Sequence, residues 1–115
     1  MQEQKNFRQV AADLVAQYER QPRLGPETIT KLPAYRPFIE EAVRAGWTGP
    51  EMELDPDFWA RSAEWVASAS DEQRRRWLHS VLRSERWNAE CPMAILEALQ
   101  GGQMAAFVTA LREPA

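Results

Sequence analysis

The stretch from Ser70 to Leu111, SDEQRRRWLHSVLRSERWNAECPMAILEALQGGQMAAFVTAL, decides the fold of this chain. Ser70 and Gln73 have the spacing of a capping box, in which each side chain bonds the backbone amide of the other residue. Two acidic residues follow Ser70 directly, where the dipole of a helix favours negative charge. These signals predict a helix that begins after Ser70 and ends between residues 87 and 90.

The predicted helix is amphipathic, because its apolar residues recur at helical spacing while the opposite face is basic. The apolar stripe comprises Trp77, Leu78, Val81 and Leu82, and the basic face comprises Arg75, Arg76, His79, Arg83 and Arg86. Arg74 and Glu85 lie near the apolar stripe, so we expect each of them to have a partner or to sit at the edge of the stripe.

Two shorter helices are predicted after the central one. Pro92 suits the first position of a helix, and the two glycines at 101–102 should end that helix, since glycine takes the left-handed conformation that closes one. A last helix is predicted over 103–113, where Pro114 ends it. The residues expected to face inward are Met93, Leu96, Leu99, Met104, Phe107, Val108 and Leu111.

The first half of the chain shows three further helical patterns. The first covers residues 3–19, and the second covers 33–45, where Gly46 is a natural C-terminal cap. The third begins at Asp55 with Pro56 in its first turn. Their apolar faces comprise Phe7, Val10, Leu14 and Tyr18; Tyr35, Phe38, Ile39, Ala42 and Val43; and Phe58, Trp59, Ala63, Trp65, Val66 and Ala69.

Residues 27–32 (ETITKL) are ambiguous between a short strand and a helical turn or extended connector. We favour the helical turn or connector, because the chain offers no second strand for pairing. The expected fold is therefore all-α, a single compact bundle of about five helices, with one domain over residues 1–115.

Composition narrows the class of protein further. The chain has 115 residues, of which 44% are apolar, and a net charge of −3, so we expect a packed core and no generic affinity for nucleic acid. It has no apolar run long enough for a membrane span and no signal-peptide core at its N-terminus. One cysteine cannot form an internal disulfide. These features predict a cytoplasmic protein without membrane association.

The basic face carries the candidate binding site, which comprises Arg75, His79, Arg83, Arg86 and Trp87. The positively charged residues align along one side of the predicted helix and could hold a carboxylate or a phosphate. Two ordinary alternatives stay open: a solvated face, or a clamp formed with acidic residues of the same chain. Trp87 could add a flat apolar surface beside the arginines.

No catalytic, cofactor or metal site is expected. The sequence lacks a glycine-rich phosphate loop, zinc-ligand spacing and a paired-histidine motif. Cys91 and His79 lack an orienting group that would make them a nucleophile and base. The carboxylates between residues 51 and 57 lack the central glycine and closing glutamate of a calcium loop.

The segment VLRSERW, preceded by RAGW and FWARSAEW, resembles an uncharacterised bacterial family of domains of unknown function. Arg83, Arg86 and Trp87 match the R-x-x-R-aromatic core of that family, and Gly102 with Leu111 matches its end. The resemblance covers residues 38–112, but the glutamate–glycine step of the family is absent. It implies a small bacterial helical module with no assigned activity.

The leading functional hypothesis is a non-catalytic module that binds an acidic surface of another protein, in a regulatory role. The alternative is a nucleic-acid-associated accessory protein that uses the arginine face, and a homodimer stays open. Salt dependence separates the two hypotheses, because contacts to phosphates release counterions and weaken steeply with salt.

Overall fold

In the computed structural model, which describes residues 6–21, 23, 25–87 and 93–112, all regular structure is helical. The elements are α1 (Phe7–Arg20), α2 (Pro26–Ile29), α3 (Tyr35–Arg44), the 3-10 turn η1 (Phe58–Ala60), α4 (Ala63–Ser68), α5 (Asp71–Trp87), α6 (Ala94–Gln100) and α7 (Gln103–Arg112). Five helices of the described part have seven residues or more, and this part contains no strand, so the all-α prediction is confirmed.

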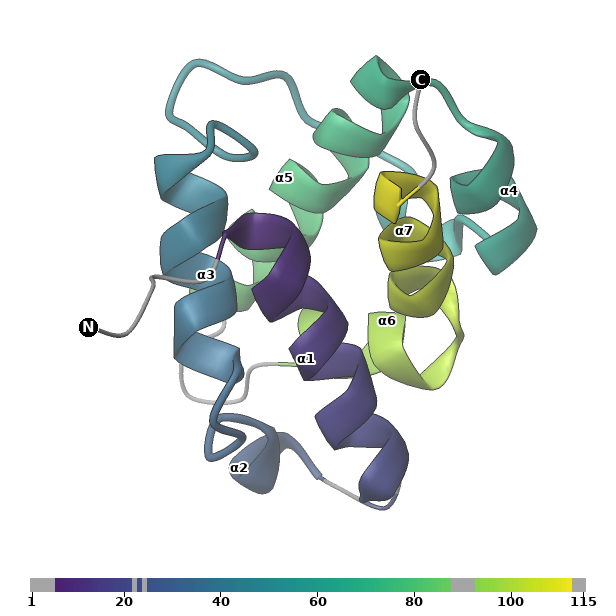
Figure 1. Cartoon of the computed structure of the whole chain (residues 1–115). Coiled ribbons are helices and arrows are strands. Elements are labelled where there is room, and N and C mark those ends of the chain that lie inside the picture. Colours follow the sequence, from purple (N-terminus) through teal and green to yellow (C-terminus); the bar gives the residue numbers. More distant parts are fainter. Residues whose placement is uncertain (1–5, 22, 24, 88–92, 113–115) are drawn as a thin grey trace.

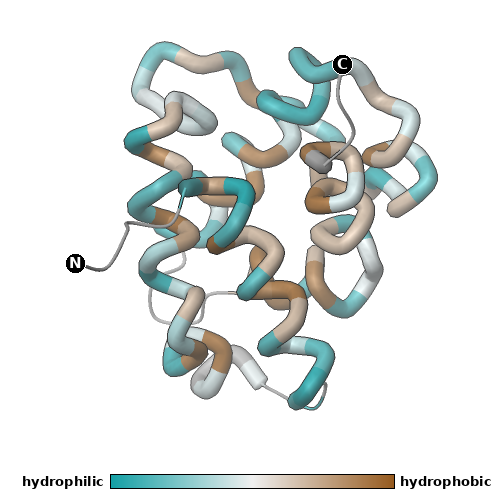
Figure 2. Tube along the Cα trace, in the orientation of Figure 1, coloured by the Kyte–Doolittle hydropathy of each residue, from teal (hydrophilic) through white to brown (hydrophobic). Residues whose placement is uncertain are grey.

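Helix α1 crosses the front of the molecule between α3 and α7, and it contacts both of them (Figure 1). Helix α5 runs behind it and packs on α6 and η1, while α4 covers α7. The radius of gyration, 13.2 Å, is that of a compact chain of this length. Hydrophobic and hydrophilic residues are interspersed along each helix (Figure 2), and the buried apolar residues form one cluster.

The core is organised around Trp77, whose side chain is only 1% exposed. Its ring lies 5.7 Å from that of Phe107, between ring centroids. The ring of Phe7 contacts the ring of Phe107 and lies 5.5 Å from that of Phe38, between ring centroids. Aromatic contacts therefore join α1, α3, α5 and α7. Helices α5, α6 and α7 supply more than half of the described core residues, as predicted for the stretch from Ser70 to Leu111.

The helix ends follow local signals. The Ser70–Gln73 capping box is present, with hydrogen bonds of 2.8 and 3.1 Å. A second box between Asn6 and Gln9 begins α1 at Phe7, whereas the predicted start at residue 3 lies outside the described residues. Gly102 has φ +82°, the conformation that closes α6. The ambiguous ETITKL segment is helical at its start, where α2 ends at Ile29.

The predicted helix from Asp55 to Ala69 is wrong, because the chain is broken into η1 and α4. Arg61 reaches back to the Asp55 carboxylate with two hydrogen bonds of 3.0 Å, and residues six apart do not share a helix face. The Arg61 carbonyl accepts from Gln103 of α7 instead of continuing a helix. Ser62 then caps α4, and Trp59, predicted in the core, is 71% exposed.

The sequence prediction was also wrong for two further apolar residues, which it placed on inward-facing sides of their helices. Val43 is 55% exposed at the end of α3, and Met93 is exposed because it is the N-terminal cap of α6 rather than part of its inner face. Pro92, the predicted first residue of that helix, lies outside the described residues. The inner face of α6 comprises Ile95, Leu96, Ala98 and Leu99.

Candidate binding site between α3 and α5

The segment 45–57, which follows α3, is laid along the basic face of α5. It begins with a tight helix end in which Gly46 has φ +82° and the Trp47 amide donates to the Ala42 carbonyl at 2.8 Å. The Arg75 guanidinium donates to the Gly46 carbonyl at 2.9 Å and lies 4.4 Å from the centre of the Trp47 ring. Arg75 therefore fixes the start of the segment and covers its tryptophan.

The rest of the segment is held by the next turn of α5. Arg76 forms an ion pair with Glu53 at 3.1 Å, and the Asp55 amide donates to the Ser80 hydroxyl at 2.7 Å. Arg76 is also paired with Glu72 at 2.8 Å. Two of the five arginines of α5, Arg75 and Arg76, are thus bound to other groups of the chain. This part of the basic face is still partly exposed, but its guanidinium groups are engaged by groups of the same chain.

Arg74 has partners inside the chain, as expected from its place near the apolar stripe. It donates to the Val66 and Ala69 carbonyls, which α4 leaves free where it ends, and it pairs with Asp71 at 2.8 Å. Such contacts between a cation and the last carbonyls of a helix are a common way to satisfy them. Arg74 therefore closes α4 and contributes nothing to the site.

Glu85, the other residue near the apolar stripe, is 3% exposed and joins three helices. Its carboxylate accepts from the Tyr35 hydroxyl at 2.7 Å and from the Ile95 amide at 3.0 Å. Ile95 is the second residue of α6, so Glu85 performs the capping that the Met93 side chain cannot. Burial, followed by the hydrogen bond and charge of Glu85, raises the pKa of Tyr35 far above its ordinary value.

His79 is 4% exposed, so it does not belong to a solvated face as the sequence suggested. Its Nδ1 atom lies 2.7 Å from the Thr48 Oγ1 atom, in a hydrogen bond between α5 and the segment 45–57. Its Nε2 atom is buried without a hydrogen-bond partner in the described part of the chain. Burial, and then the positive charge of Arg83, lower the pKa of His79 below its ordinary value of 6.5.

This lowered pKa predicts that acid weakens the fold through His79. Below pH 6.5 the unfolded chain binds a proton at His79 more readily than the folded chain, so stability falls as the pH falls through the window below 6.5. His79→Asn, which keeps a polar group near Thr48 but does not titrate there, should flatten this dependence. Thermal melts of both proteins between about pH 5 and pH 7.5 check the prediction. Identical slopes would contradict it.

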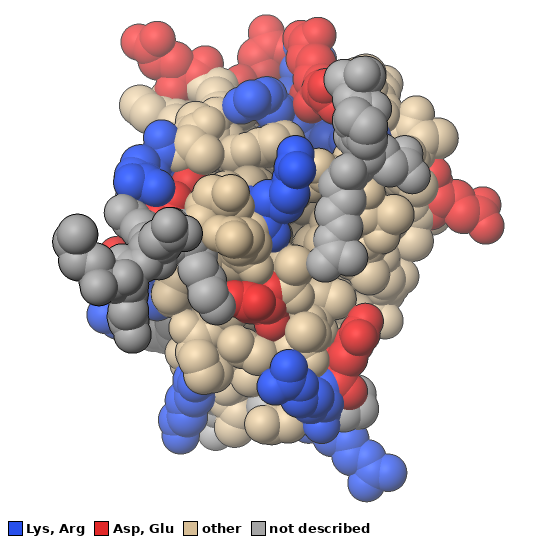
Figure 3. Space-filling model, in the orientation of Figure 1, with Lys and Arg blue, Asp and Glu red and all other residues tan. Residues whose placement is uncertain are grey.

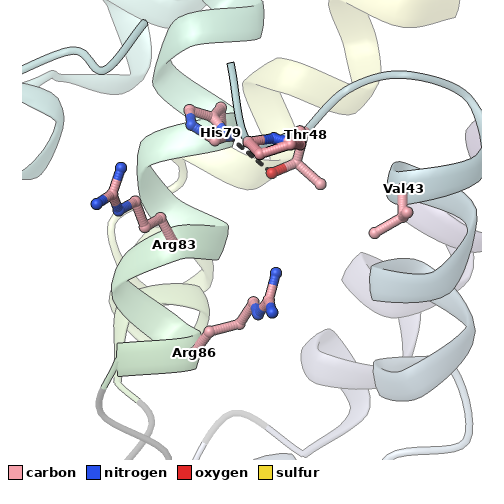
Figure 4. Close-up of a pocket in the computed structure, with 7 residues that line it drawn as sticks. Val43, Thr48, His79, Arg83 and Arg86 are labelled. Carbon is pink, nitrogen blue, oxygen red and sulfur yellow. Dashed lines mark hydrogen bonds between the residues drawn. The ribbon is translucent and has the colours of Figure 1, made fainter. Parts of the chain in front are cut away.

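Arg83 and Arg86 differ from the other arginines of α5, since both are exposed and neither has an ion pair with a described residue. The internal clamp left open from the sequence is therefore not found in the described residues. The two side chains also diverge (Figure 4): Arg86 points into the space between α5 and α3, while Arg83 extends to the other side of α5. They do not form a single fork in this arrangement.

A cavity of about 620 Å³ separates the end of α3 from α5. Its lining comprises Val43, Thr48, Gly49, Pro50, His79, Arg83 and Arg86. The hydrogen bonds of the segment 45–57 to α5 reach as far as Ser80, and beyond this point Arg83 and Arg86 of α5 line the cavity (Figure 4). The cavity thus combines apolar wall residues with the Arg86 guanidinium, which has no ion pair with a described residue, and is bordered by Arg83.

No family model, curated protein or solved structure matches the chain. The resemblance carried by VLRSERW therefore stays a prediction, and the site must be judged by its own geometry. Trp87 is the last residue of α5, and its side chain lies outside the described part of the chain. Cys91 also lies outside the described residues.

A second, smaller hollow of about 260 Å³ lies on the other side of Arg83. Its lining comprises Leu54, Asp55, Pro56, Phe58, Ser80, Arg83 and Ser84. Sequence reasoning missed Thr48, Val43 and Leu54 as residues of these hollows. The run of glycine and proline after Thr48 marks a loop, but it does not show against which helix that loop lies.

Other kinds of site receive no support from the described residues. They contain no group of three or more histidine, cysteine, aspartate or glutamate residues that could hold a metal ion. No single described helix is long and apolar enough to cross a membrane; α6 and α7 meet the length and composition test only as a pair, which is bent by 82°. On the face shown in Figure 3, basic and acidic side chains are interspersed rather than gathered into one basic patch.

Proposed function

We propose that this protein is a non-catalytic binding module that captures an acidic segment of another protein in the cavity between α3 and α5. The observation that carries the proposal is the Arg86 side chain, which points into a cavity of about 620 Å³ without a carboxylate partner from the described residues. The other arginines near the site are engaged, so Arg83 and Arg86 are the charges left for a ligand.

The chemistry of arginine favours an acidic ligand. The guanidinium is charged at every physiological pH, and its planar fork binds a carboxylate with two parallel hydrogen bonds. The volume of the cavity lies within the range of about 300–1,000 Å³ that is usual for binding pockets. Val43 and Pro50 add apolar surface to its wall, which suits the hydrocarbon part of a peptide side chain.

A protein partner fits these features better than a nucleic acid. Affinity for nucleic acid grows with the number of phosphates that lysine and arginine neutralise. In α5, two arginines have no ion pair with a described residue, and they do not point the same way. The net charge of the whole chain is −3, which repels a polyanion. A ligand with a single carboxylate beside apolar groups does not need so many cations.

The proposal predicts that Arg83→Gln together with Arg86→Gln weakens ligand capture without weakening the fold. Selection of a random-peptide phage library on the wild-type protein should enrich aspartate and glutamate, and the enriched peptides should bind the double variant at least about ten-fold more weakly. The free energy of unfolding should change by no more than about 0.5 kcal/mol, as for most surface substitutions.

Arg20→Gln is the matched control, because Arg20 is an exposed arginine far from the site. The Phe7 end of α1 stacks on Trp47 beside the site, and Arg20 lies at the opposite end of this helix. The proposal fails if selection enriches no acidic residues or if Arg20→Gln weakens binding as much as the double variant. A fall in melting temperature of several degrees in the double variant would instead indicate an internal clamp. A short DNA duplex that displaces the peptides, with steep salt dependence, would favour the nucleic-acid alternative.

A further inference from the structure

We infer that the hollow beside Arg83 is a second, apolar subsite, so that the partner segment carries an apolar side chain close to its carboxylate. This inference rests on the proposed function and specifies the chemistry of the partner. Three features support it. The wall of the hollow carries apolar side chains, its polar groups already have hydrogen-bond partners, and Arg83 lines both the hollow and the large cavity.

The hollow offers apolar side chains at its opening. Leu54 is 45% exposed, and Pro56 and Phe58 complete this wall, opposite the residues of α5. Its volume is about 260 Å³. An apolar cavity of about 150 Å³ is already large enough to bind benzene, so the hollow has room for a leucine, isoleucine or phenylalanine side chain.

The polar groups of the hollow already have partners within the chain. The Asp55 carboxylate accepts two hydrogen bonds from Arg61 and one from the Asp57 amide at 3.1 Å. The Ser80 hydroxyl accepts from the Asp55 amide and donates to the Arg76 carbonyl at 2.8 Å. Ser84 is engaged as well. A ligand therefore gains little by offering polar groups here and gains most by burying apolar surface.

Arg83 connects the two spaces, because it lines both the large cavity and the hollow. A segment that crosses it can place a carboxylate near Arg86 on one side and an apolar side chain near Leu54 on the other. Because both spaces border the Arg83 side chain, the two anchors of the partner segment should lie close together in its sequence.

The test uses synthetic copies of one acidic peptide selected on the wild-type protein. Replacing its apolar residue by alanine should weaken binding to the wild-type protein about ten-fold, and the same replacement should weaken binding to the Leu54→Ser variant by less than about two-fold, since the subsite is already damaged. Met93→Ser is the control, because Met93 is an exposed apolar side chain that lines neither space; its peptide affinities should match those of the wild type.

Three results would overturn the inference. The first is a set of selected peptides that are acidic but carry no apolar residue near the carboxylate. The second is the same ten-fold loss from the alanine replacement with the wild type and with Leu54→Ser. The third is a concentration-dependent dimer that Leu54→Ser abolishes, which would make a second copy of the chain the occupant. In the first two cases the proposed function survives as long as Arg83 and Arg86 are still needed. Loss of acidic enrichment itself would remove both.

Discussion

Replacing Trp77 by alanine is expected to lower the free energy of unfolding by about 3–5 kcal/mol, the range for removing a large aromatic side chain from a core. Trp77 is 1% exposed and lies against Phe107, where α5 and α7 meet. Its loss leaves a cavity that the surrounding helices cannot fill without moving. Chemical denaturation of the two proteins, monitored by circular dichroism at the helix band, measures the difference.

Trp59→Ala is the matched control for this prediction. Both residues were assigned to the core from the sequence, but Trp59 lies in η1 and is 71% exposed. Its removal should change the free energy of unfolding by no more than about 0.5 kcal/mol. Equal losses for the two variants would mean that residues 55–69 form the continuous helix that the sequence suggested and that the break at Arg61 is not real.

Glu85→Ala should have the second largest effect on stability, about 2–4 kcal/mol. The substitution leaves two donors without their acceptor, the partly buried Tyr35 hydroxyl and the buried Ile95 amide, and an unsatisfied buried group costs about 1–3 kcal/mol. It also removes the cap of α6. Denaturant melts measure the loss, and native-state hydrogen exchange should show α6 opening more readily than α7.

Tyr35→Phe separates the two roles of Glu85. Alone, Tyr35→Phe should lower the free energy of unfolding by about 1 kcal/mol, because Glu85 keeps its hydrogen bond to the Ile95 amide. Combined with Glu85→Ala it should cost less than the sum of the two single changes, since the hydroxyl that would be left unsatisfied is gone. Strict additivity would contradict the account of Glu85 as the link between α3, α5 and α6.

The parts of the fold that were predictable depend on residues close together in sequence. The Ser70–Gln73 box, the left-handed glycines at 46 and 102, and the apolar stripe of α5 are all local patterns, and the structure contains each of them. These signals sufficed for the fold class and for the central helices of the bundle.

The break between η1 and α4 could not be predicted in the same way. No glycine or proline interrupts residues 57–69, and the apolar residues there repeat at helical spacing. The break depends on Asp55, which draws Arg61 back, and on Gln103 of α7, which takes the Arg61 carbonyl. A side chain more than forty positions away therefore competes with the local helical preference.

The candidate site was predictable only in part for a similar reason. The sequence shows that arginines gather on one face of α5, but it does not show that the segment 45–57 lies over the first half of that face. Arg75 binds the Gly46 carbonyl, Arg76 pairs with Glu53, and His79 is hydrogen-bonded to Thr48. Among the described arginines of α5, Arg83 and Arg86 form no ion pair with a described residue and remain for a ligand.

The central claim, that Arg83 and Arg86 are the free cations of the site, is tested most directly by nuclear magnetic resonance of the arginine Nε–Hε groups. A selected acidic peptide is titrated into the labelled protein, and the signals are assigned with single arginine-to-glutamine variants. The account predicts that the Arg86 signal shifts most and exchanges more slowly with water, that the Arg83 signal shifts as well, and that the signals of Arg75 and Arg76 stay in place. Shifts confined to Arg75 and Arg76, or spread equally over all arginines, would contradict it.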